Sequence, residues 1–409
     1  MMFGLKEAVV APLVRAIAGD ADAPGEKTTE EVADRFARAS WTGIAEPGDR
    51  MAGILVGTLG ATRALTAVVE RWDAARVREE LASAGVDDAE DEEVAPALAR
   101  WQPRLQSGPA VIALKQAARY GVRLATPADS GWPSGLADLG PHAPIALWVR
   151  GNWSTLHAVE RSFALVGARA ATGYGEHVTM EASAGLADRG YCIVSGAAYG
   201  IDGMAHRAAL ASSGQTVAIL AGGVDRFYPS GHDALLNRIV ECGAVVSELP
   251  CGAAPTKWRF LQRNRLIAAV SQATVVLEAG WRSGSLNTAG HAAALGRALG
   301  AVPGPVTSAA SAGCHRLIRE FAATCVTTVD EMVELLPFAP VSAAAEEPSG
   351  RTVEQTRILD AVSGKSPRSV DDIARRAGLS VARAQAVLGP LELDGAVTER
   401  DRGWVKATR

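Results

Sequence analysis

The fold is decided by residues 163–195, which read FALVGARAATGYGEHVTMEASAGLADRGYCIVS. Two short apolar runs, Phe163–Ala168 and Cys192–Ser195, flank a segment with a helical pattern, Gly175–Arg189. A buried strand, a helix and a second buried strand form the repeating unit of a parallel sheet. The first strand ends in a glycine-containing turn, and the crevice beyond such strand ends is where open α/β sheets bind ligands.

The same alternation continues to about residue 303. Four more apolar runs are predicted as buried strands: Val217–Ala221, Ala244–Glu248, Thr274–Glu278 and Ala301–Pro303. The segments between them are predicted as helices: Gly203–Ser212, Ala234–Cys242, Asn264–Ser271 and Leu286–Leu299. Near-continuous apolar strands separated by helices indicate a parallel sheet covered on both faces. We therefore expect an α/β fold with an extended Rossmann-like, doubly wound parallel sheet.

The chain before the sheet is predicted to be mainly helical. Residues 1–37 are expected to be an extension, partly disordered, with a loosely ordered segment at Gly19–Thr29. Residues 38–105 are expected to be a helical (SAM-like) domain; the helices of this region are predicted at Glu30–Ala39, Met51–Thr58 and Ala61–Ala84. The Rossmann-like domain is then predicted over 106–338, opening with a helix at Ala110–Tyr120 and strands at Gly121–Thr126 and Ala146–Val149.

The last part of the chain is predicted to be a separate module. Residues 339–351 read as a linker, and residues 352–409 as a winged helix with helices at Val353–Val362, Val370–Ala377 and from Val381, followed by a hairpin at Ala396–Glu399 and Gly403–Lys406. The third helix offers only Arg383 as a cation and contains Gly389-Pro390, which is expected to break it. We favour protein docking over DNA binding for this module, although Arg375, Arg376, Arg400, Arg402 and Lys406 could contact phosphates.

The composition limits the class of protein. The 409 residues are 48% hydrophobic and 21% charged, with a net charge of −4, so a nucleic-acid binder of this kind must concentrate its positive charge locally. The five cysteines are scattered without a CxxC pair, which argues against a disulfide framework or zinc site. The apolar run near Ala8–Ala18 is broken by Pro12 and Arg15, so we expect neither a signal peptide nor a membrane span, and a cytoplasmic location.

One run of nine residues stands out, Lys257–Arg265 (KWRFLQRNR). Four cations and two aromatic residues directly precede an apolar helical stretch, Leu266–Val270. Cations at a helix start oppose the helix dipole, so the cluster predicts a compensating anion. The interleaved rings suggest a single-stranded nucleic acid, whose phosphates bind arginine and whose bases stack on aromatic rings. The alternative is a surface helix start whose arginines pair with Glu248 or Glu278.

Four glycine-rich segments follow the predicted strands: Val166–Arg169 with Gly173, Ser195-Gly196 with Gly200, Ala221–Gly223, and Ser283–Ser285. Backbone amides and helix N-termini at such loops favour anions. The spacing GARAATGYG is not GxGxxG, and neither GxxxxGK[ST] nor GxSxG occurs, so no cofactor and no hydrolase triad are predicted. Asp202 and His206 lie four residues apart on one predicted helix; we favour a structural pair over a metal or acid–base pair, and we assign no metal.

Taken in order, these motifs resemble the DNA-processing protein A (DprA/Smf) family over roughly residues 38–406. The matching pieces are VGAR…GYG (166–175), SGAAYGIDGMAH (195–206), GGVDRFYPSGH (222–232), SELP (247–250), RNRLIA (263–268), EAGWRSGSLNTA (278–289) and VPG (302–304). The resemblance implies a non-enzymatic protein that binds single-stranded DNA in a pocket at the sheet edge, protects it, and helps to load the recombinase RecA in natural transformation. A homodimer with two pockets would gain avidity on one strand.

The resemblance also implies a set of DNA-binding residues. Arg169 would contact phosphate, and the remaining members are Gly167, Ser195, Gly196, Gly200, Lys257, Phe260, Arg263, Asn264, Arg265, Gly284 and Ser285. The chain departs from the family pattern FPxRNR, because Leu261-Gln262 follows Phe260, and Asn287 replaces an aliphatic residue. Trp258 is a second possible stacking ring, ranked below Phe260.

The rival interpretation is an enzyme, a nucleotide phosphoribohydrolase of the lysine-decarboxylase-like, cytokinin-activating type. That family combines an arginine-rich helix start with a PGGxGTxxE signature in which the glutamate is catalytic. The comparable segment here, SGSLNTAGHA (283–292), has no glutamate three residues after Thr288, so the binding protein is favoured.

Overall fold

The computed structural model describes residues 3–19, 28–86, 91–336, 352–364, 366–401 and 403–407. The chain divides into two compact units, Met1–Ala339 and Pro340–Arg409, which we describe separately. The linker expected at 339–351 and most of the segment expected to be loosely ordered at Gly19–Thr29 lie outside the described residues.

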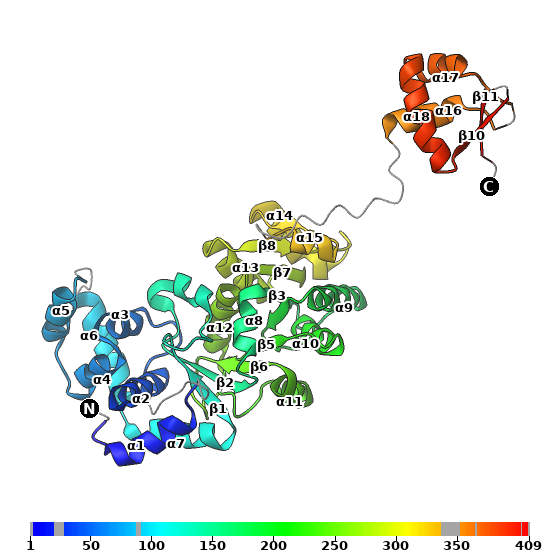
Figure 1. The fold of residues 1–409 in the computed structure, drawn as a ribbon. Coiled ribbons are helices and arrows are strands. Elements are labelled where there is room, and N and C mark those ends of the chain that lie inside the picture. The colour runs from blue at the N-terminus through cyan, green and yellow to red at the C-terminus, as the bar shows by residue number, and fades with distance from the viewer. Residues whose placement is uncertain are drawn as a thin grey trace. The chain divides into compact units, whose positions relative to one another are not determined.

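The first unit is built on a nine-stranded sheet in the order β1-β2-β6-β5-β4-β3-β7-β8-β9 (Figure 1). Its strands are β1 Val122–Ala125, β2 Leu147–Gly151, β3 Ser162–Gly167, β4 Cys192–Ser195, β5 Thr216–Ile219, β6 Ala244–Ser247, β7 Ala273–Glu278, β8 Ala298–Ala301 and β9 Thr324–Cys325. From β6 across to β9 all neighbours are parallel, as predicted. The edge formed by β1 and β2 is antiparallel, so the sheet is mixed.

The strand order reverses at β3. The chain runs outward through β4, β5 and β6, then returns to place β7 on the other side of β3, where Leu165 pairs with Val275. This is the topological switch point of a doubly wound sheet, and ligands bind in the crevice beyond the carboxyl ends of the strands there. The observed topology therefore points to the loops after β3 and β7.

Helices cover both faces of the sheet. Successive residues of a strand point to opposite faces, and both sets are buried. Phe163 and Leu165 of β3 pack with α9 (Gly173–Asp188), α10 (Ile201–Ala211) and α15 (Val329–Val333). Ala164 and Val166 of the same strand pack with α12 (Lys257–Val270), α13 (Ser285–Ala294), α14 (Ala312–Glu320) and the short α8 (Thr155–Ala158). Helix α11 (Asp233–Cys242) packs beside β5 and β6. The Rossmann-like architecture is confirmed.

One strand boundary was predicted wrongly. We expected a helix to Leu299 and a strand at Ala301–Pro303, but α13 ends at Ala294 and β8 begins at Ala298. Gly296 adopts φ +66°, the left-handed conformation that ends helices, so the alanine-rich segment turns there into the strand.

The N-terminal helices share a core with the sheet. They are α1 Glu7–Ala16, α2 Thr29–Ile44, α3 Arg50–Leu59, α4 Ala61–Val69, α5 Ala74–Ser83, α6 Asp91–Trp101 and α7 Ser107–Arg119. Residues 1–37, expected to be an extension, include α1, whose Val10 and Val14 are buried, and the Leu124 amide of β1 donates to the Ile17 carbonyl (2.7 Å). The single helix expected at Ala61–Ala84 is two helices, because the chain turns at Arg71 and Asp73 caps α5.

Within the described residues, no single helix is long and apolar enough to cross a bilayer. The pair α3 and α4 passes a length-and-composition test only when combined, and the two helices bend by 116°. Leu55 of α3 and Leu65 of α4 lie in the protein core.

The second unit is a winged helix with α16 Val353–Ala361, α17 Val370–Ala377, α18 Val381–Leu393 and the hairpin β10 Val397–Arg400 and β11 Gly403–Lys406. The Ser369 hydroxyl caps α17, as expected. The expected break in the third helix is absent from its described residues, since α18 continues through Pro390. Leu388 and Leu391, on either side of the proline, are buried in the core of this unit, which offsets the lost hydrogen bond.

Candidate nucleic-acid interface

A cleft of about 640 Å³ lies at the switch point of the sheet. Its walls come from the loop after β3 (167–170), the loop after β7 (280–285) and one face of α12. Among the residues predicted as DNA-binding, the cleft contains Gly167, Arg169, Phe260, Arg263, Asn264, Gly284 and Ser285. The topology therefore brings together seven of the twelve predicted residues.

The Lys257–Arg265 run lies inside α12, which corrects our expectation that it precedes the helix. Thr256 is the N-cap, and its hydroxyl accepts from the Arg259 amide (3.3 Å). The run therefore spirals around the first turns of the helix and its side chains face different surroundings. Phe260 and Arg263 line the cleft, Trp258 lines a separate groove, and Lys257 is exposed at the helix start outside the cleft lining.

Phe260 is the predicted stacking ring, and it lines the cleft. The Arg169 guanidinium lies 5.3 Å from the ring centroid, and the Tyr228 ring lies 5.6 Å away at an interplanar angle of 56°. The missing family proline does not disturb a turn here, because Leu261 and Gln262 are helical. Arg169 is exposed and forms no ion pair within the described part of the chain, so its charge is available to an anion.

Arg263 is buried and has a structural function. Its Nη1 donates to the Gly196 carbonyl (2.6 Å) and to the Ile219 carbonyl, tying the ends of β4 and β5 to α12. Burial lowers the pKa of Arg263 to about 10, and the nearby Asp202 carboxylate opposes this shift. Burial also raises the pKa of Asp202, against the Arg263 charge and backbone hydrogen bonds. Arg263 therefore forms the floor of the cleft and supplies positive potential from below.

Arg265 is placed away from the cleft, as the alternative interpretation of the run proposed. Both of its terminal nitrogens donate to Glu248 at 2.8 Å, and its Nε donates to the His142 carbonyl (3.2 Å). The Arg265 side chain is 4% exposed. Its predicted contact with DNA is therefore corrected to a buried ion pair.

The glycine loops after β3 and β4 serve close packing of the backbone. A Cβ at Gly200 would lie 2.3 Å from the Ala168 carbonyl oxygen, and one at Gly167 would lie 2.5 Å from Ile201. The Gly196 amide is already used, because it donates to Asp202 Oδ2 (3.1 Å). Ser195 is fully buried and its hydroxyl donates to the Leu165 carbonyl (2.6 Å). The Ser195 hydroxyl and the Gly196 amide, both predicted to contact DNA, therefore already have partners within the protein.

The loop after β7 forms the opposite rim. Gly284 is exposed, and Ser285 begins α13 with its hydroxyl 2.8 Å from that of Ser283. The Asn264 side-chain amide donates to Asn287 Oδ1 (3.2 Å), which explains why a polar residue suits position 287 in this chain. The N-terminus of α13 therefore faces the cleft with polar side chains around it.

Three residues of the site were missed from the sequence. Trp281 (52% exposed) and Arg282 (exposed) line the cleft, and Tyr228 (51% exposed) contacts Phe260 from the loop after β5. Each belongs to a quoted motif, GGVDRFYPSGH or EAGWRSGS. The signal was an arginine beside an aromatic residue inside a glycine loop, the same pairing that made the α12 run conspicuous.

Asp202 and His206 each contact another group of the protein. The His206 Nδ1 lies 2.7 Å from the Thr216 hydroxyl, and burial lowers the pKa of His206 to about 3, so the ring is neutral. No group of three or more His, Cys, Asp or Glu side chains within the described ranges could hold a metal ion. The structure favours the structural role that we preferred for this pair.

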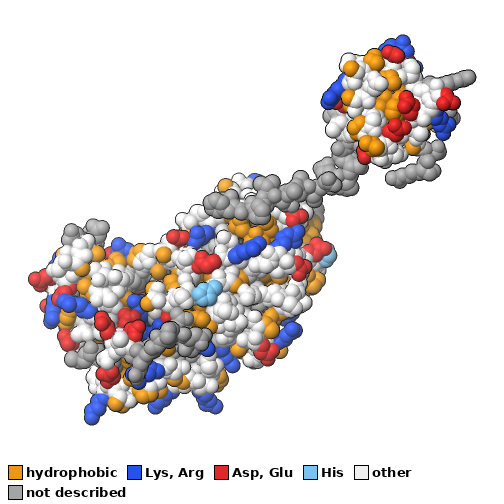
Figure 2. All heavy atoms as spheres, viewed as in Figure 1, with side chains coloured by type: hydrophobic (Ala, Val, Ile, Leu, Met, Phe, Trp, Pro, Cys, Tyr) orange, Lys and Arg blue, Asp and Glu red, His pale blue; other side chains and the backbone are white. Residues whose placement is uncertain are grey.

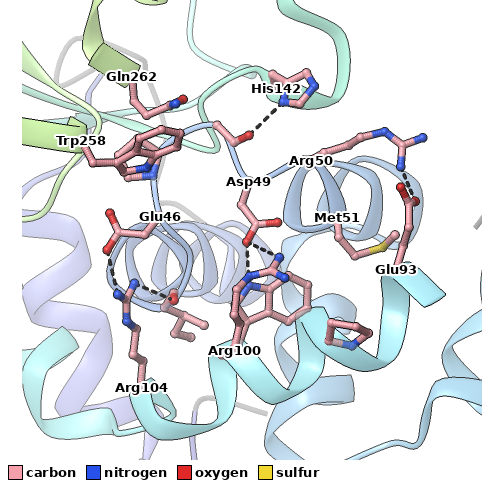
Figure 3. Close-up of a pocket in the computed structure, with 15 residues that line it drawn as sticks. Glu46, Asp49, Arg50, Met51, Glu93, Arg100, Arg104, His142, Trp258 and Gln262 are labelled. Atoms are coloured by element: carbon pink, nitrogen blue, oxygen red, sulfur yellow. Dashed lines mark hydrogen bonds and ion pairs between the residues drawn. The ribbon is translucent and has the colours of Figure 1, made fainter. Parts of the chain in front are cut away.

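A second hollow, the α12 groove, lies on the other side of that helix, against α3 and α6 (Figure 3). Trp258 and Gln262 reach into it, and its arginines are paired: Arg50 with Glu93, Arg100 with Asp49, and Arg104 with Glu46. On the face shown in Figure 2, basic and acidic side chains are likewise interspersed. The cleft differs from this groove, because Arg169 and Arg282 form no ion pair with a described residue.

Comparison with known proteins agrees with this geometry. The model of the DNA recombination-mediator protein A family matches residues 123–337, more than half of the chain, and the DprA winged helix domain matches residues 342–401. A putative DNA processing protein DprA of Mycobacterium tuberculosis is 46% identical over 301 residues, covering 70% of this chain and 77% of that protein. Protein Smf of Escherichia coli K12 is 38% identical over 274 residues, covering 65% and 72%.

A solved structure shows the same fold. The X-ray structure of DNA processing protein A from Streptococcus pneumoniae superposes with a TM-score of 0.60 at 26% identity, covering 76% of this chain and all of that one. A further relative, from Bacillus subtilis, is also named DNA processing protein DprA and is 34% identical over 194 residues, covering 47% of this chain and 65% of that protein. The chain belongs to the DNA recombination-mediator protein A (DprA/Smf) family.

Proposed function

We propose that this chain is a non-enzymatic single-stranded-DNA-binding protein that protects DNA strands and promotes their loading with the recombinase RecA in natural transformation and recombination. The observation that carries the proposal is the cleft at the switch point. Arg169 and Arg282 are exposed there, and neither forms an ion pair with any residue that the structure describes. Arg169 also lies beside the Phe260 ring. Family membership adds support, because the matching family model describes a DNA recombination-mediator protein.

The cleft offers the two contacts that a single strand needs. Arg169 and Arg282 would neutralise phosphates, with Lys257 at the start of α12 adding a further charge. A base would stack on Phe260, which Tyr228 supports from behind. The Gly284 amide at the start of α13 would donate to a phosphate oxygen, whereas the Ser285 amide already donates to the Ser283 hydroxyl (3.4 Å). None of these contacts reads a base edge, so binding is expected to tolerate any sequence.

The family resemblance supports the finer parts of the proposal. A homodimer would present two clefts to one strand, and the second cleft would bind at a high effective concentration. The RecA partnership, the homodimer and the cytoplasmic location stay predictions.

The phosphoribohydrolase alternative requires a catalytic carboxylate beside the loop after β7. Among the described residues that line the cleft, the carboxylate is Asp202, which is 6% exposed and accepts a hydrogen bond from the Gly196 amide. The nearby Glu278 is also buried and accepts from the Thr172 amide and hydroxyl. Purified protein is therefore expected to release no free base from a nucleoside monophosphate.

The test is a titration of a labelled oligonucleotide followed by fluorescence anisotropy at moderate salt. Wild type is expected to bind single-stranded DNA more tightly than the matching duplex. Arg169→Ala and Lys257→Ala are each expected to weaken binding to the single strand, since each removes a charge near the strand. Unchanged affinity for both variants would refute the assignment of the cleft.

A further inference from the structure

A second set of aromatic and arginine side chains begins at the wall of the cleft. Tyr228, in contact with Phe260, belongs to the loop after β5. Phe227 directly precedes Tyr228 in that loop, and the Arg150 guanidinium lies over its ring, 4.9 Å from the centroid. Arg226 is exposed and lines a small recess together with Tyr228 and Phe260. The loop after β5 therefore joins the cleft to the surface of β2.

The contacts continue from β2 to α7. Arg150 lies between two rings, because its guanidinium is also 5.3 Å from the centroid of Tyr120. Tyr120 caps the C-terminus of α7 and is 39% exposed. Arg119 lies on the same ring, 5.7 Å from its centroid, and is exposed. We call the set Arg119, Tyr120, Arg150, Arg226, Phe227 and Tyr228 the arginine–aromatic track.

The cations of the track keep their charge available. In the described part of the chain, no carboxylate lies within ion-pair distance of Arg119, Arg150 or Arg226. Arg150 Nη1 donates to the Val224 carbonyl (3.3 Å), and the one acidic residue of the loop, Asp225, accepts from the Gly252 amide (2.8 Å). Arginines held on rings without a counter-ion attract phosphate more strongly than arginines neutralised by carboxylates.

We infer that a single strand bound in the cleft leaves it past Tyr228 and continues along the arginine–aromatic track. The strand's phosphates would face Arg226, Arg150 and Arg119, and its bases would stack on the exposed rings of Tyr228 and Tyr120. This inference rests on the proposed function. An alternation of unpaired arginines and rings, continuous with a stacking ring in the cleft, suits a single-stranded nucleic acid better than an acidic peptide, which has no bases for the rings.

The test compares two lengths of oligo-thymidylate on the full chain. About six nucleotides would fill the cleft alone, and about twenty would also cover the track. Tyr120→Ala is expected to weaken binding of the long oligonucleotide roughly five-fold or more and to leave the short one unchanged. Tyr120→Phe, which keeps the ring, is expected to restore the affinity. Arg119→Ala is expected to reduce the salt dependence for the long oligonucleotide only.

Arg161→Ala is the matched control. Its guanidinium lies 4.4 Å from the centroid of Tyr191, so it forms the same kind of stack. Arg161 directly precedes β3 and therefore lies at the amino end of that strand, whereas the cleft lies beyond its carboxyl end. Arg161→Ala is expected to leave the affinity for both the short and the long oligonucleotide unchanged. An equal loss for both lengths in Tyr120→Ala, or no loss for either, would overturn the track. If Arg169→Ala still weakens both lengths in that case, the proposed function stands; if it weakens neither, the proposed function fails first.

Discussion

Helix α12 separates two hollows that are both rich in arginine but differ in what surrounds it. In the α12 groove, Arg50, Arg100 and Arg104 each pair with a carboxylate (Figure 3). In the cleft, Arg169 and Arg282 have no carboxylate partner among the residues described. The number of cations is similar on the two sides, so the presence or absence of neighbouring acids is what distinguishes them.

The difference suggests a division of labour. Glu46 of the groove accepts hydrogen bonds from Arg104 of the N-terminal helices and from Arg259 of α12, so it ties the two together. Paired arginines hold α12 in place, and the unpaired ones on its other side remain free for a ligand. Substitutions of single residues on each side of α12 can test this distinction.

The largest effect is expected when a buried arginine loses the carboxylate with which it forms an ion pair. Glu248→Ala leaves Arg265 buried and unpaired, which should lower the free energy of unfolding by about 3–5 kcal/mol. Urea denaturation measures the loss, and Glu320→Ala, which removes an exposed partner of Arg316, is the control and should change little. A Glu248→Ala protein as stable as the wild type would contradict the role of the buried ion pair between Glu248 and Arg265.

The next largest effect is expected from the two aromatic residues of the run, whose loss should affect DNA binding to different extents. Phe260→Ala is expected to weaken binding of single-stranded DNA by about 1–3 kcal/mol, because it removes the ring that stacks a base in the cleft. Trp258→Ala should have little effect, although Trp258 is the more exposed ring at 57%, because it faces the groove. Anisotropy titrations at one salt concentration decide this, and the reverse ranking would move the binding site to the groove.

Sequence reasoning named seven residues that the fold brings to the candidate cleft, but it could not assign their roles. Arg263 and Arg265 are two residues apart in one motif, and the side chains point to different sides of α12. Their partners, the Gly196 carbonyl and Glu248, come from distant segments that the fold brings together. A local pattern shows that cations are clustered; only the tertiary structure shows which of them are neutralised.

Strands β1 to β8 were predicted within a few residues, because apolar runs mark the buried strands of a covered parallel sheet. Strand β9 was missed, since its two residues are exposed. The start of α12 was missed, since its first turns lack an apolar period, although Thr256 was available as a cap. The order of the strands was also beyond the sequence. That β7 lies beside β3, and so creates the cleft, depends on long-range pairing that no single segment encodes.

Salt dependence offers a finer comparison of the two hollows. Arg169→Ala and Arg282→Ala should each reduce the slope of log affinity against log salt by about 0.7, the contribution of one phosphate contact on a single strand. Arg100→Ala in the groove should leave the slope unchanged, because Asp49 already neutralises that arginine. Titrations at four salt concentrations would measure all three slopes. A reduced slope for Arg100→Ala would show that the groove also contacts DNA.

The smallest effect is expected from Glu46, which accepts hydrogen bonds from Arg104 and from Arg259 of α12. The hydrogen bond from Arg259 holds the pKa of Glu46 below its ordinary value of 4.5, with burial opposing the shift and Arg104 reinforcing it. A carboxylate with a lowered pKa stabilises the folded state above its ordinary pKa, and the stabilisation is lost as the pH falls through that range. Glu46→Gln should therefore lower the free energy of unfolding by about 1 kcal/mol at neutral pH.

Urea denaturation across pH 4–7 would measure this difference, which should shrink toward the acid end as the wild-type carboxyl is protonated. Glu80→Gln, which removes a surface partner of Arg63, controls for the general effect of losing an acidic residue. A difference that stayed constant with pH would mean that Glu46 acts through its shape and packing. The groove would then be a packing contact, and its paired arginines would no longer explain how α12 is held for the cleft.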